Sequence, residues 1–347
     1  MNIADRKISE DEEVFIVAEL SANHVHEFKI AVETIIAMKK AGADAVKLQT
    51  YTPDTITIDC DNEYFQIKQG TLWDGKTLYQ LYKEAYTPWE WQPELKEIAE
   101  NEGLICFSSP FDKTAADFLE KLNVPAYKIA SFEITDIPLI EYVASKGKPV
   151  IISTGISELD DIQLAVDTCK KTGNEQIALL KCTSAYPAPL EEVNLNTITD
   201  LKRRFKTIVG LSDHTMGISV PIAAVSLGAR IIEKHFILDR NLGGPDSAFS
   251  LEPEEFTQMV KSIREVEKAL GKVNYKLSEK IKKSKKFSRS LFVVQDITKG
   301  EVFNSENIRS IRPGFGLHPK FFKVVIGKKA KKDIKRGTPL NWNLIDK

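Results

Sequence analysis

Short apolar runs alternate with longer amphipathic segments through the first 275 residues of the chain. Each run is almost continuously apolar, which is typical of strands that are covered on both faces in a parallel sheet. The eight runs are residues 14–20, 45–50, 104–108, 126–130, 149–153, 177–181, 207–211 and 230–235. We therefore expect eight strands, each followed by a helix.

The segments between the runs carry the helical period. In the clearest of them Phe256, Met259 and Ile263 recur at steps of three and four residues, after Pro253 and before Gly271. Proline suits the first turn of a helix and glycine suits its end, so this spacing predicts a helix. Eight strand–helix units in about 270 residues predict an α/β fold, a (β/α)8 TIM barrel. A doubly wound open sheet would more often show a glycine-rich first turn, and none is present.

The pattern changes after residue 272. A charged stretch over 273–287 predicts a linker or a solvated helix. Short β-like pieces at Ser290–Val294 and Lys323–Ile326, with turn signals at Gly300 and Gly337, predict a small β-rich domain over 288–347. The barrel domain is expected over 1–272. Because a domain of about 60 residues holds only a small core, we expect it to dock on a partner.

Composition fits an ordinary globular protein. The chain has 347 residues, of which 42% are apolar and 28% are charged, and this excludes a disordered or collagen-like chain. No apolar run reaches the roughly 18 residues of a membrane span, and the charged N-terminus lacks the apolar core of a secretory signal. The four cysteines are scattered, so neither a thiolate zinc site nor a disulfide framework is expected. We expect a soluble, cytoplasmic protein.

The net charge of −1 hides an uneven distribution. Residues 276–347 hold 19 Lys and Arg against 6 Asp and Glu, whereas the residues before them hold 29 against 43. A basic tail can bind nucleic acid, but base stacking would need aromatic side chains interleaved with the basic run, and the run lacks them. A small basic domain that docks on an acidic one, for example in a neighbouring subunit, explains the pattern better.

Polar residues follow the apolar runs at all eight expected strand ends, where a barrel carries its active site. Lys47 and Lys128 lie at the ends of apolar strands, where an unpaired ammonium is costly and two facing cations repel unless an anion lies between them. Ammonium groups with hydroxyl donors suit a phosphate and a neighbouring carboxylate. The candidate donors are Ser109, Ser131, Ser153 and Ser212. Ion pairs with Glu19 or Glu133 are the alternative explanation for the two lysines.

Two of the five histidines, His214 and His235, end the seventh and eighth runs, which are neighbours in a closed barrel. Imidazoles on adjacent strands, with a carboxylate such as Glu19 near them, suit a divalent manganese, zinc or iron site. Asp213 and Asp246 are candidate ligands, partners of the ligands or substrate contacts. Either histidine alone would more often be an ordinary hydrogen-bonded residue, so the metal hypothesis depends on the pair.

Residues 70–77 match the P-loop pattern G-x-x-x-x-G-K-[ST] letter for letter. A P-loop needs a buried strand directly before it, whereas residues 62–69 are mixed and polar. We interpret the segment instead as part of a long loop after the second strand that can fold over the site.

Seven ordered motifs resemble those of the sialic acid synthases, or nonulosonate synthases, which condense phosphoenolpyruvate with a six-carbon amino sugar. They are residues 18–24 (AELSANH), 46–50 (VKLQT), 108–111 (SSPF), 127–131 (YKIAS), 153–155 (STG), 210–215 (GLSDHT) and 233–236 (EKHF). The tail resembles the C-terminal SAF, or antifreeze-like, domain of the same enzymes. Within the family, residues 72–82, 87–91 and 312–319 resemble pseudaminic acid synthases most closely.

The resemblance implies a set of site residues. Catalytic roles are implied for Glu19, Glu133, His214 and His235. Phosphoenolpyruvate contacts are implied for Lys47, Ser109, Lys128, Ser131, Ser153, Ser184 and Ser212, and Ser184 stands where the sialic acid synthases carry asparagine. Sugar contacts are implied for Gln49, Glu133, Tyr186, Asp246 and Arg312.

The resemblance also implies the chemistry. The acceptor would be 2,4-diacetamido-2,4,6-trideoxy-L-altrose, and His214 and His235 would bind a divalent metal cation, manganese first, with magnesium or cobalt as alternatives. The metal would act as a Lewis acid on the sugar aldehyde, while Glu19 or Glu133 handles protons, an assignment that the sequence leaves open. In this family the small domain caps the site of the other subunit, so Arg312 would act in trans in a domain-swapped homodimer.

Other functions remain open from the sequence. Within the same family, the chain could be an N-acetylneuraminate or legionaminate synthase. A more distant hypothesis is an aldolase that forms a Schiff base at Lys128 or Lys181. The other distant hypothesis is a protein that binds nucleic acid through its basic tail. The composition of the tail and the lack of a long apolar run nevertheless predict no nucleic-acid and no membrane partner.

Overall fold

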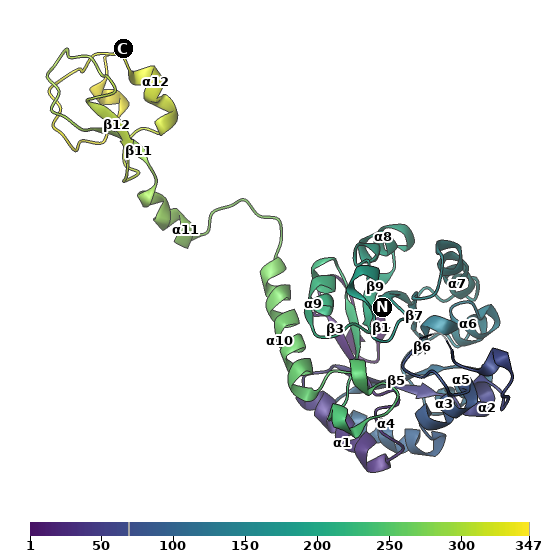
Figure 1. Ribbon diagram of the computed structural model, residues 1–347. Helices are drawn as coiled ribbons and strands as arrows, with labels where there is room; N and C mark the ends of the chain where they lie inside the picture. The colour runs from purple at the N-terminus through teal and green to yellow at the C-terminus, as the bar shows by residue number, and fades with distance from the viewer. Residues whose placement is uncertain (69, 347) are drawn as a thin grey trace. The chain divides into compact units, whose positions relative to one another are not determined.

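The computed structural model describes residues 1–68 and 70–346. Gln69, in segment 62–69, and Lys347, at the end of the predicted domain 288–347, lie outside the described residues. The chain divides into two compact units, Met1–Gly271 and a second unit that begins at Lys272 (Figure 1). Each unit is described by itself. The expected domain limits at 272 and 288 remain predictions.

The first unit is a closed barrel of eight parallel strands in the order β10-β3-β4-β5-β6-β7-β8-β9. The strands are β3 (Phe15–Glu19), β4 (Ala45–Thr50), β5 (Ile105–Pro110), β6 (Tyr127–Ile129), β7 (Val150–Ser153), β8 (Ile177–Cys182), β9 (Ile208–Asp213) and β10 (Ile231–His235). Each of them falls on one of the eight apolar runs. The predicted TIM barrel is therefore confirmed.

A helix follows each strand and covers the outside of the barrel (Figure 1). The helices are α1 (Phe28–Lys40), α4 (Gln92–Asn101), α5 (Lys113–Lys121), α6 (Ile137–Ala144), α7 (Leu159–Lys171), α8 (Asn196–Phe205), α9 (Ser219–Ser226) and α10 (Pro253–Leu270). Helix α10 has Pro253 in its first turn and Gly271 at its C-cap, and it buries Phe256, Met259 and Ile263. The helix that this spacing predicts is confirmed.

The barrel interior is closed at one end by a hairpin that sequence analysis did not predict. Strands β1 (Asn2–Ile3) and β2 (Arg6–Lys7) pair antiparallel, and Ile3 and Ile8 join the inward-facing apolar cluster of the barrel. That cluster also contains Phe15, Phe107 and Ile231, all fully buried. Because apolar side chains fill this end, polar side chains gather at the other end, where the strands have their carboxyl ends.

The connection between β4 and α4 is long and folded. It contains α2 (Pro53–Ile56), the 3-10 helix η1 (Glu63–Phe65) and α3 (Leu78–Ala85). The backbone N–H of Ile67 donates to the Lys76 carbonyl oxygen, so the segment that matches the P-loop pattern lies on a hairpin. A 3-10 helix, and not a buried strand, precedes that hairpin among the described residues, which supports the loop interpretation.

The second unit has its own small core. Strand β11 (Ser290–Val293) pairs antiparallel with β12 (Ile308–Ile311), and the core includes Leu291, Phe303 and Val325. The predicted strand at Lys323–Ile326 is wrong, because this segment is helix α12 (Phe322–Val325), which continues directly from the 3-10 helix η8 (Pro319–Phe321). Its three consecutive apolar residues suggest a strand, but Val325 alone of them is fully buried while Val324 is exposed.

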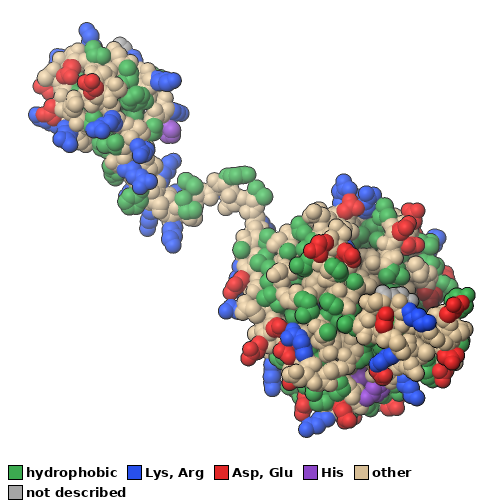
Figure 2. Space-filling model, in the orientation of Figure 1, with side chains coloured by type: hydrophobic (Ala, Val, Ile, Leu, Met, Phe, Trp, Pro, Cys, Tyr) green, Lys and Arg blue, Asp and Glu red, His purple; other side chains and the backbone are tan. Residues whose placement is uncertain are grey.

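Between Gly271 and β11 the chain forms helix α11 (Glu279–Ser284) with the 3-10 helix η7 (Lys285–Phe287), and its side chains are exposed. Figure 2 shows Lys and Arg side chains along this segment and over the second unit. Among the residues that the structure describes, no helix is both long and apolar enough to cross a membrane.

Candidate active site

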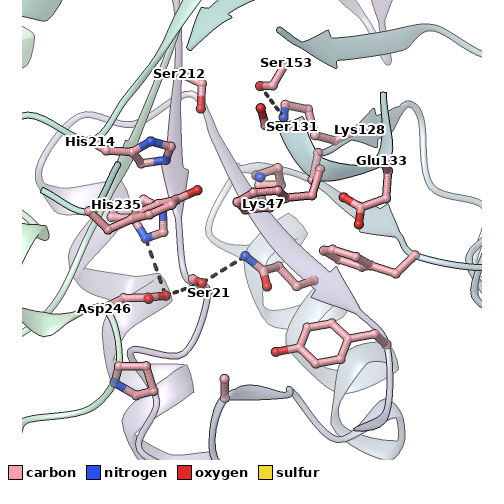
Figure 3. A pocket seen from close by; sticks show the side chains of 18 of the residues that line it. Ser21, Lys47, Lys128, Ser131, Glu133, Ser153, Ser212, His214, His235 and Asp246 are labelled. Carbon is pink, nitrogen blue, oxygen red and sulfur yellow. Dashed lines mark hydrogen bonds and ion pairs between the residues drawn. The ribbon is translucent and has the colours of Figure 1, made fainter. Parts of the chain in front are cut away.

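A cavity of about 300 Å³ opens at the carboxyl ends of the barrel strands (Figure 3). Eleven residues selected from the sequence line it: Lys47, Gln49, Lys128, Ser131, Glu133, Ser153, Tyr186, Ser212, His214, His235 and Asp246. Glu19 and Ser184 lie one contact behind this lining, and Ser109 is buried beside Gln49 on the neighbouring strand. Arg312 belongs to the second unit. The barrel thus brings most of the predicted residues together.

The two lysines lie deep in the barrel and are paired. Lys47 on β4 is the register partner of Glu19 on β3, and its Nζ lies 2.7 Å from Glu19 Oε2 and 3.2 Å from Glu233 Oε1. Lys128 Nζ lies 3.7 Å from the same Glu233 oxygen and donates to Ser153 Oγ at 2.7 Å. Glu233 is therefore the anion that lies between the two ammonium groups.

This pairing changes one inference from the sequence. Repulsion between Lys47 and Lys128 does not by itself require an external anion, because Glu233 lies near both ammonium groups and offsets it. Lys47 also forms an ion pair with Glu19, as in the alternative explanation from the sequence. Sequence reasoning missed Glu233 as a site residue, although it stands at an expected strand end. The signal that could have found it is the alternation along β10, which gives Glu233 and His235 the same inward direction.

Electrostatics separate the two carboxylates of this cluster. Burial raises the pKa of Glu19 to about 7, against the opposing effect of Lys47. Burial also opposes ionisation of Glu233, but the neighbouring Lys128 and Lys47 outweigh it and lower the pKa of Glu233 to about 2. At neutral pH Glu233 is therefore firmly ionised and Glu19 is ionised only in part, so the carboxylates do not fully neutralise the two lysines, although burial also lowers the pKa of Lys128. The cluster retains an attraction for anions.

Hydroxyl groups surround this cationic end. Ser212 donates to Glu233 Oε1 at 3.0 Å, and Ser184 donates to Ser131 Oγ at 2.8 Å. A Cβ on Gly155 would overlap the hydroxyl oxygens of Ser184 and Ser131, so glycine lets the backbone after β7 approach these two hydroxyls without displacing them. Hydroxyls and ammonium groups in this arrangement suit a phosphate.

The two histidines lie side by side at the ends of β9 and β10 (Figure 3). Their ring centroids are 5.3 Å apart in an edge-to-face arrangement. His214 Nδ1 lies 3.0 Å from the Thr183 carbonyl oxygen, whereas the buried His235 Nδ1 has no hydrogen-bond partner and lies 3.8 Å from Asp246 Oδ2. Burial lowers the pKa of His235 well below its usual value, which keeps the ring in the neutral form that binds metals.

This pair fits a metal with an incomplete set of protein ligands. Within residues 1–68 and 70–346, no group of three or more His, Cys, Asp or Glu side chains is arranged to hold a metal ion. Burial lowers the pKa of His214 as well, but Cys182 and the Thr183 carbonyl oxygen outweigh it and raise that pKa above its usual value. His235, which is held neutral and has an unpartnered nitrogen, and His214 through its second ring nitrogen can still supply part of a coordination shell, and a substrate or water can supply the rest.

A chain of hydrogen bonds joins the lysine cluster to Asp246. Gln49 Nε2 donates to Glu19 Oε1 at 3.2 Å and to Ser21 Oγ at 2.9 Å, and Ser21 donates to Asp246 Oδ2 at 2.5 Å. Burial raises the pKa of Asp246. Sequence reasoning noted Ser21 only as a polar residue after the first strand, and its place in this chain comes from the fold of the β3–α1 loop.

Glu133 lies apart from the lysine cluster on the 3-10 helix η3 (Ser131–Glu133). Burial raises its pKa to about 7, although Lys128 opposes the shift, and its Oε2 has no hydrogen-bond partner. A carboxyl group that titrates near neutrality beside a cavity is suited to accept or donate a proton.

The remaining wall of the cavity is apolar and was largely missed from the sequence. It is formed by Tyr51, Ile56, Trp73, Leu81, Tyr82, Ala85, Phe111 and Phe132. Trp73 donates its Nε1–H to the Pro245 carbonyl oxygen at 3.0 Å and packs on Tyr186 with ring centroids 5.5 Å apart. Which side chains of the long β4–α4 connection face the cavity depends on how it folds, and the local pattern of the sequence does not encode that.

Comparison with known proteins gives relatives over almost the whole chain. A model described as the NeuB family matches residues 34–275, and an SAF domain model matches residues 288–346. The chain is 50% identical over 330 residues to a pseudaminic acid synthase of Campylobacter jejuni subsp. jejuni serotype O:2, with 95% of this chain and 96% of the relative covered. It is 49% identical over 333 residues to a pseudaminic acid synthase of Helicobacter pylori, with 96% and 98% covered.

A solved structure has the same architecture. The N-acetylneuraminic acid (sialic acid) synthetase from Leptospira borgpetersenii serovar Hardjo-bovis, crystallised in complex with citrate, superposes with a TM-score of 0.73 at 31% sequence identity. The superposition covers 82% of this chain and 94% of that chain.

Proposed function

The chain belongs to the NeuB family, and from that membership we propose that it is a pseudaminic acid synthase, a transferase. It joins phosphoenolpyruvate to 2,4-diacetamido-2,4,6-trideoxy-L-altrose, with water, and releases pseudaminic acid and phosphate. Half of its residues are identical to those of pseudaminic acid synthases over nearly the full chain, which supports this acceptor. The single observation that carries the chemistry is the cationic, hydroxyl-lined end of the cavity next to two facing imidazoles.

Phosphoenolpyruvate binds at the cationic end. Lys47 and Lys128 attract its phosphate and carboxylate, and the donors around them orient the phosphate. These donors are Ser131, Ser153, Ser184 and Ser212, with Ser109 behind them. Binding of the anion gives the cluster the second negative group that Glu233 alone does not supply.

His214 and His235 hold the divalent metal cation, for which we propose manganese. When bound there, the metal supplies Lewis-acid polarisation of the acceptor aldehyde. His235 keeps its ring neutral and its Nδ1 open, whereas the Thr183 carbonyl oxygen fixes the orientation of His214 through its Nδ1.

The carbon–carbon bond forms between the methylene carbon of phosphoenolpyruvate and the acceptor aldehyde carbon. The electron pair of the enol double bond makes this bond and leaves positive charge at C2, where water adds. Phosphate then leaves with cleavage of the C2–O bond. Gln49, Tyr186 and Asp246 orient the sugar, and Glu133 handles the proton at the reacting centre because its carboxyl titrates near neutrality beside the cavity. Glu19 holds Lys47 and Gln49 in position.

We place the reaction in a cytoplasmic homodimer in which Arg312 of one subunit completes the site of the other. The second unit carries exposed apolar side chains, such as Phe315 (64% exposed) and Val324 (52%), next to its basic residues. The rim around the barrel cavity carries others, such as Phe132 (57%) and Met216 (55%). Surfaces of this kind are typical of docking regions, and they support a partner for both units.

Release of phosphate from phosphoenolpyruvate tests the proposal. Purified protein with Mn²⁺ is offered the altrose derivative, N-acetylmannosamine and the legionaminic acid precursor in separate assays. We expect the altrose derivative to give the highest kcat/KM. Faster turnover of either other sugar would make the chain an N-acetylneuraminate or legionaminate synthase. Borohydride trapping of a carbonyl substrate on Lys128 or Lys181 would favour the aldolase alternative.

A further inference from the structure

The cavity has two chemically different ends. The deep end is formed by ionic and hydroxyl groups, with Lys47 and Lys128 no more than 4% exposed. The outer end is a mainly apolar wall, defined here as Ile56, Leu81, Tyr82, Ala85 and Phe111, in which the Tyr82 hydroxyl is the one polar side-chain group among the five. Of these five side chains Leu81 is buried and the others are half-buried, so the wall lies nearer to solvent than the lysines do.

The apolar wall is built mainly by the long connection between β4 and α4. Ile56 ends the short helix α2, and Leu81, Tyr82 and Ala85 lie at helical spacing on α3. Three features fix α3: Thr77 caps its N-terminus, Gln80 completes the capping box, and Tyr82 packs edge to face on Tyr51 with centroids 5.7 Å apart. Tyr51 in turn packs on Phe111 at 5.0 Å, so the wall is held to the barrel strands.

The position of this wall has a consequence for an extended six-carbon acceptor. Its aldehyde carbon must lie at the deep end, beside phosphoenolpyruvate and the two imidazoles, because the new bond forms there. The opposite end of the sugar, C6, therefore points toward the outer end. A hydroxyl at C6 would lose water against aliphatic and aromatic side chains, whereas a methyl group would gain contact with them.

We propose that the apolar wall is the specificity determinant that selects an acceptor with a methyl group at C6 over one with a hydroxymethyl group. The inference rests on the proposed function, because it assumes the acceptor aldehyde at the deep end. Apolar pockets reject an added hydroxyl by about 10²-fold in kcat/KM, so selection of this size needs no dedicated hydrogen bond.

A matched pair of acceptors tests this selection. The two sugars are 2,4-diacetamido-2,4,6-trideoxy-L-altrose and the same compound with a hydroxyl at C6. We expect the chain to prefer the 6-deoxy sugar by about 10²-fold in kcat/KM. We expect Ile56→Asn to reduce this preference about tenfold. The introduced amide can form a hydrogen bond with the C6 hydroxyl, and it replaces an apolar contact of the C6 methyl group with a polar one. Ile58→Asn is the control, since Ile58 is 59% exposed and does not line the cavity.

A second variant guards against misfolding of the first. Ala85→Ser adds one hydroxyl to a half-buried position of α3 with little change in volume, and we expect it to lower the preference in the same direction. An equal kcat/KM for both sugars in the unmodified chain, or an unchanged preference in both wall variants, would overturn the inference. If neither sugar releases phosphate while N-acetylmannosamine or the legionaminic acid precursor does, the proposed function fails instead.

Discussion

Lys47 and Lys128 are buried at the deep end of the cavity, and the charge of their neighbours decides what they can bind. Glu233 stays ionised between them, since both lysines lower its pKa to about 2 although burial opposes this. Glu19 is poised between its two forms, because burial raises its pKa to about 7. Both ammonium groups are paired with carboxylates, so the cluster is stable when empty. Partial protonation of Glu19 near neutrality leaves the cluster able to attract a phosphate, although burial also lowers the pKa of Lys128.

The ionisation of Glu133 predicts a pH-dependent change in stability. Burial raises its folded pKa to about 7, so the favourable contribution of the protonated carboxyl is complete below about pH 4.5 and is lost as the pH rises through 7. We expect the free energy of unfolding, measured in urea, to fall between pH 5 and 8 relative to that of Glu133→Gln, by at most about 3 kcal/mol.

The exposed Glu141 on α6 offers a matched control for this experiment. The difference in free energy of unfolding between the unmodified chain and Glu141→Gln should stay constant across the same pH range. Parallel curves for the unmodified chain and Glu133→Gln would show that Glu133 keeps its ordinary pKa.

Loss of one imidazole gives a direct test of the metal proposal. We expect His235→Ala to keep the circular dichroism spectrum of a folded barrel and to lower the rate of phosphate release at least about 10²-fold, the size of the loss when an electrostatic catalytic group is removed. We also expect weaker binding of Mn²⁺ itself, measured by calorimetry. His26→Ala is the control, because the His26 ring forms a hydrogen bond with the Lys83 carbonyl oxygen and does not line the cavity. Turnover near normal that resists a chelator would contradict the proposal.

An ion pair links β9 and β10, the strands at whose carboxyl ends the two histidines lie. Lys234 on β10 is the register partner of Asp213 on β9, and its Nζ donates to Asp213 Oδ2 at 2.6 Å and to the Thr215 carbonyl oxygen. Both side chains are almost completely buried, and each immediately precedes a histidine of the site. The pair therefore fixes the separation of His214 and His235 from behind the strands.

This arrangement predicts a split between stability and rate. Lys234→Met leaves Asp213 buried without its cation and should lower the free energy of unfolding by about 3–5 kcal/mol. The double variant Asp213→Asn with Lys234→Met should recover most of that loss, because the unpaired charge is gone. We expect its kcat to stay about tenfold low, since an error in positioning the imidazoles is costly. A double variant with normal kcat would make the pair purely structural.

The eight strands and their helices could be predicted because each has a strong local pattern, and because carboxyl ends of parallel strands meet at one rim. The same topology brought Lys47, Lys128, His214 and His235 together without any contact being known. The N-terminal hairpin could not be predicted, because strands of two residues carry no period. The strand at Lys323–Ile326 was predicted wrongly because three adjacent apolar residues satisfy a short strand and a short helix equally.

The apolar wall shows the other limit of sequence analysis. Ile56 and Leu81 lie 25 positions apart on two short helices of one connection, and their convergence on the cavity is a property of the packed fold. Motif matching related residues 72–82 of this connection to pseudaminic acid synthases, but it did not indicate which side chains face the acceptor. For this reason the acceptor had to come from the resemblance and the comparisons.

The distribution of charge along the chain follows its division into two units. The net charge is positive after residue 275 and negative before it, and the second unit has a core of its own. A small, basic unit with exposed apolar side chains is suited to bind an acidic surface, and the barrel of a second copy is the surface that we propose. Under this proposal Arg312, which belongs to the second unit, acts at an active site that the barrel strands of the other subunit form.

Mixed dimers test whether Arg312 acts in trans. Arg312→Ala and His235→Ala chains, each with low activity as a homodimer, are produced together in equal amounts. In a mixed dimer that shares Arg312 across subunits, the barrel with intact His235 receives the intact Arg312 of its partner, so one site of two is complete. Because half of the dimers are mixed, we expect about a quarter of the normal rate of phosphate release, whereas action in cis leaves both sites incomplete and restores nothing.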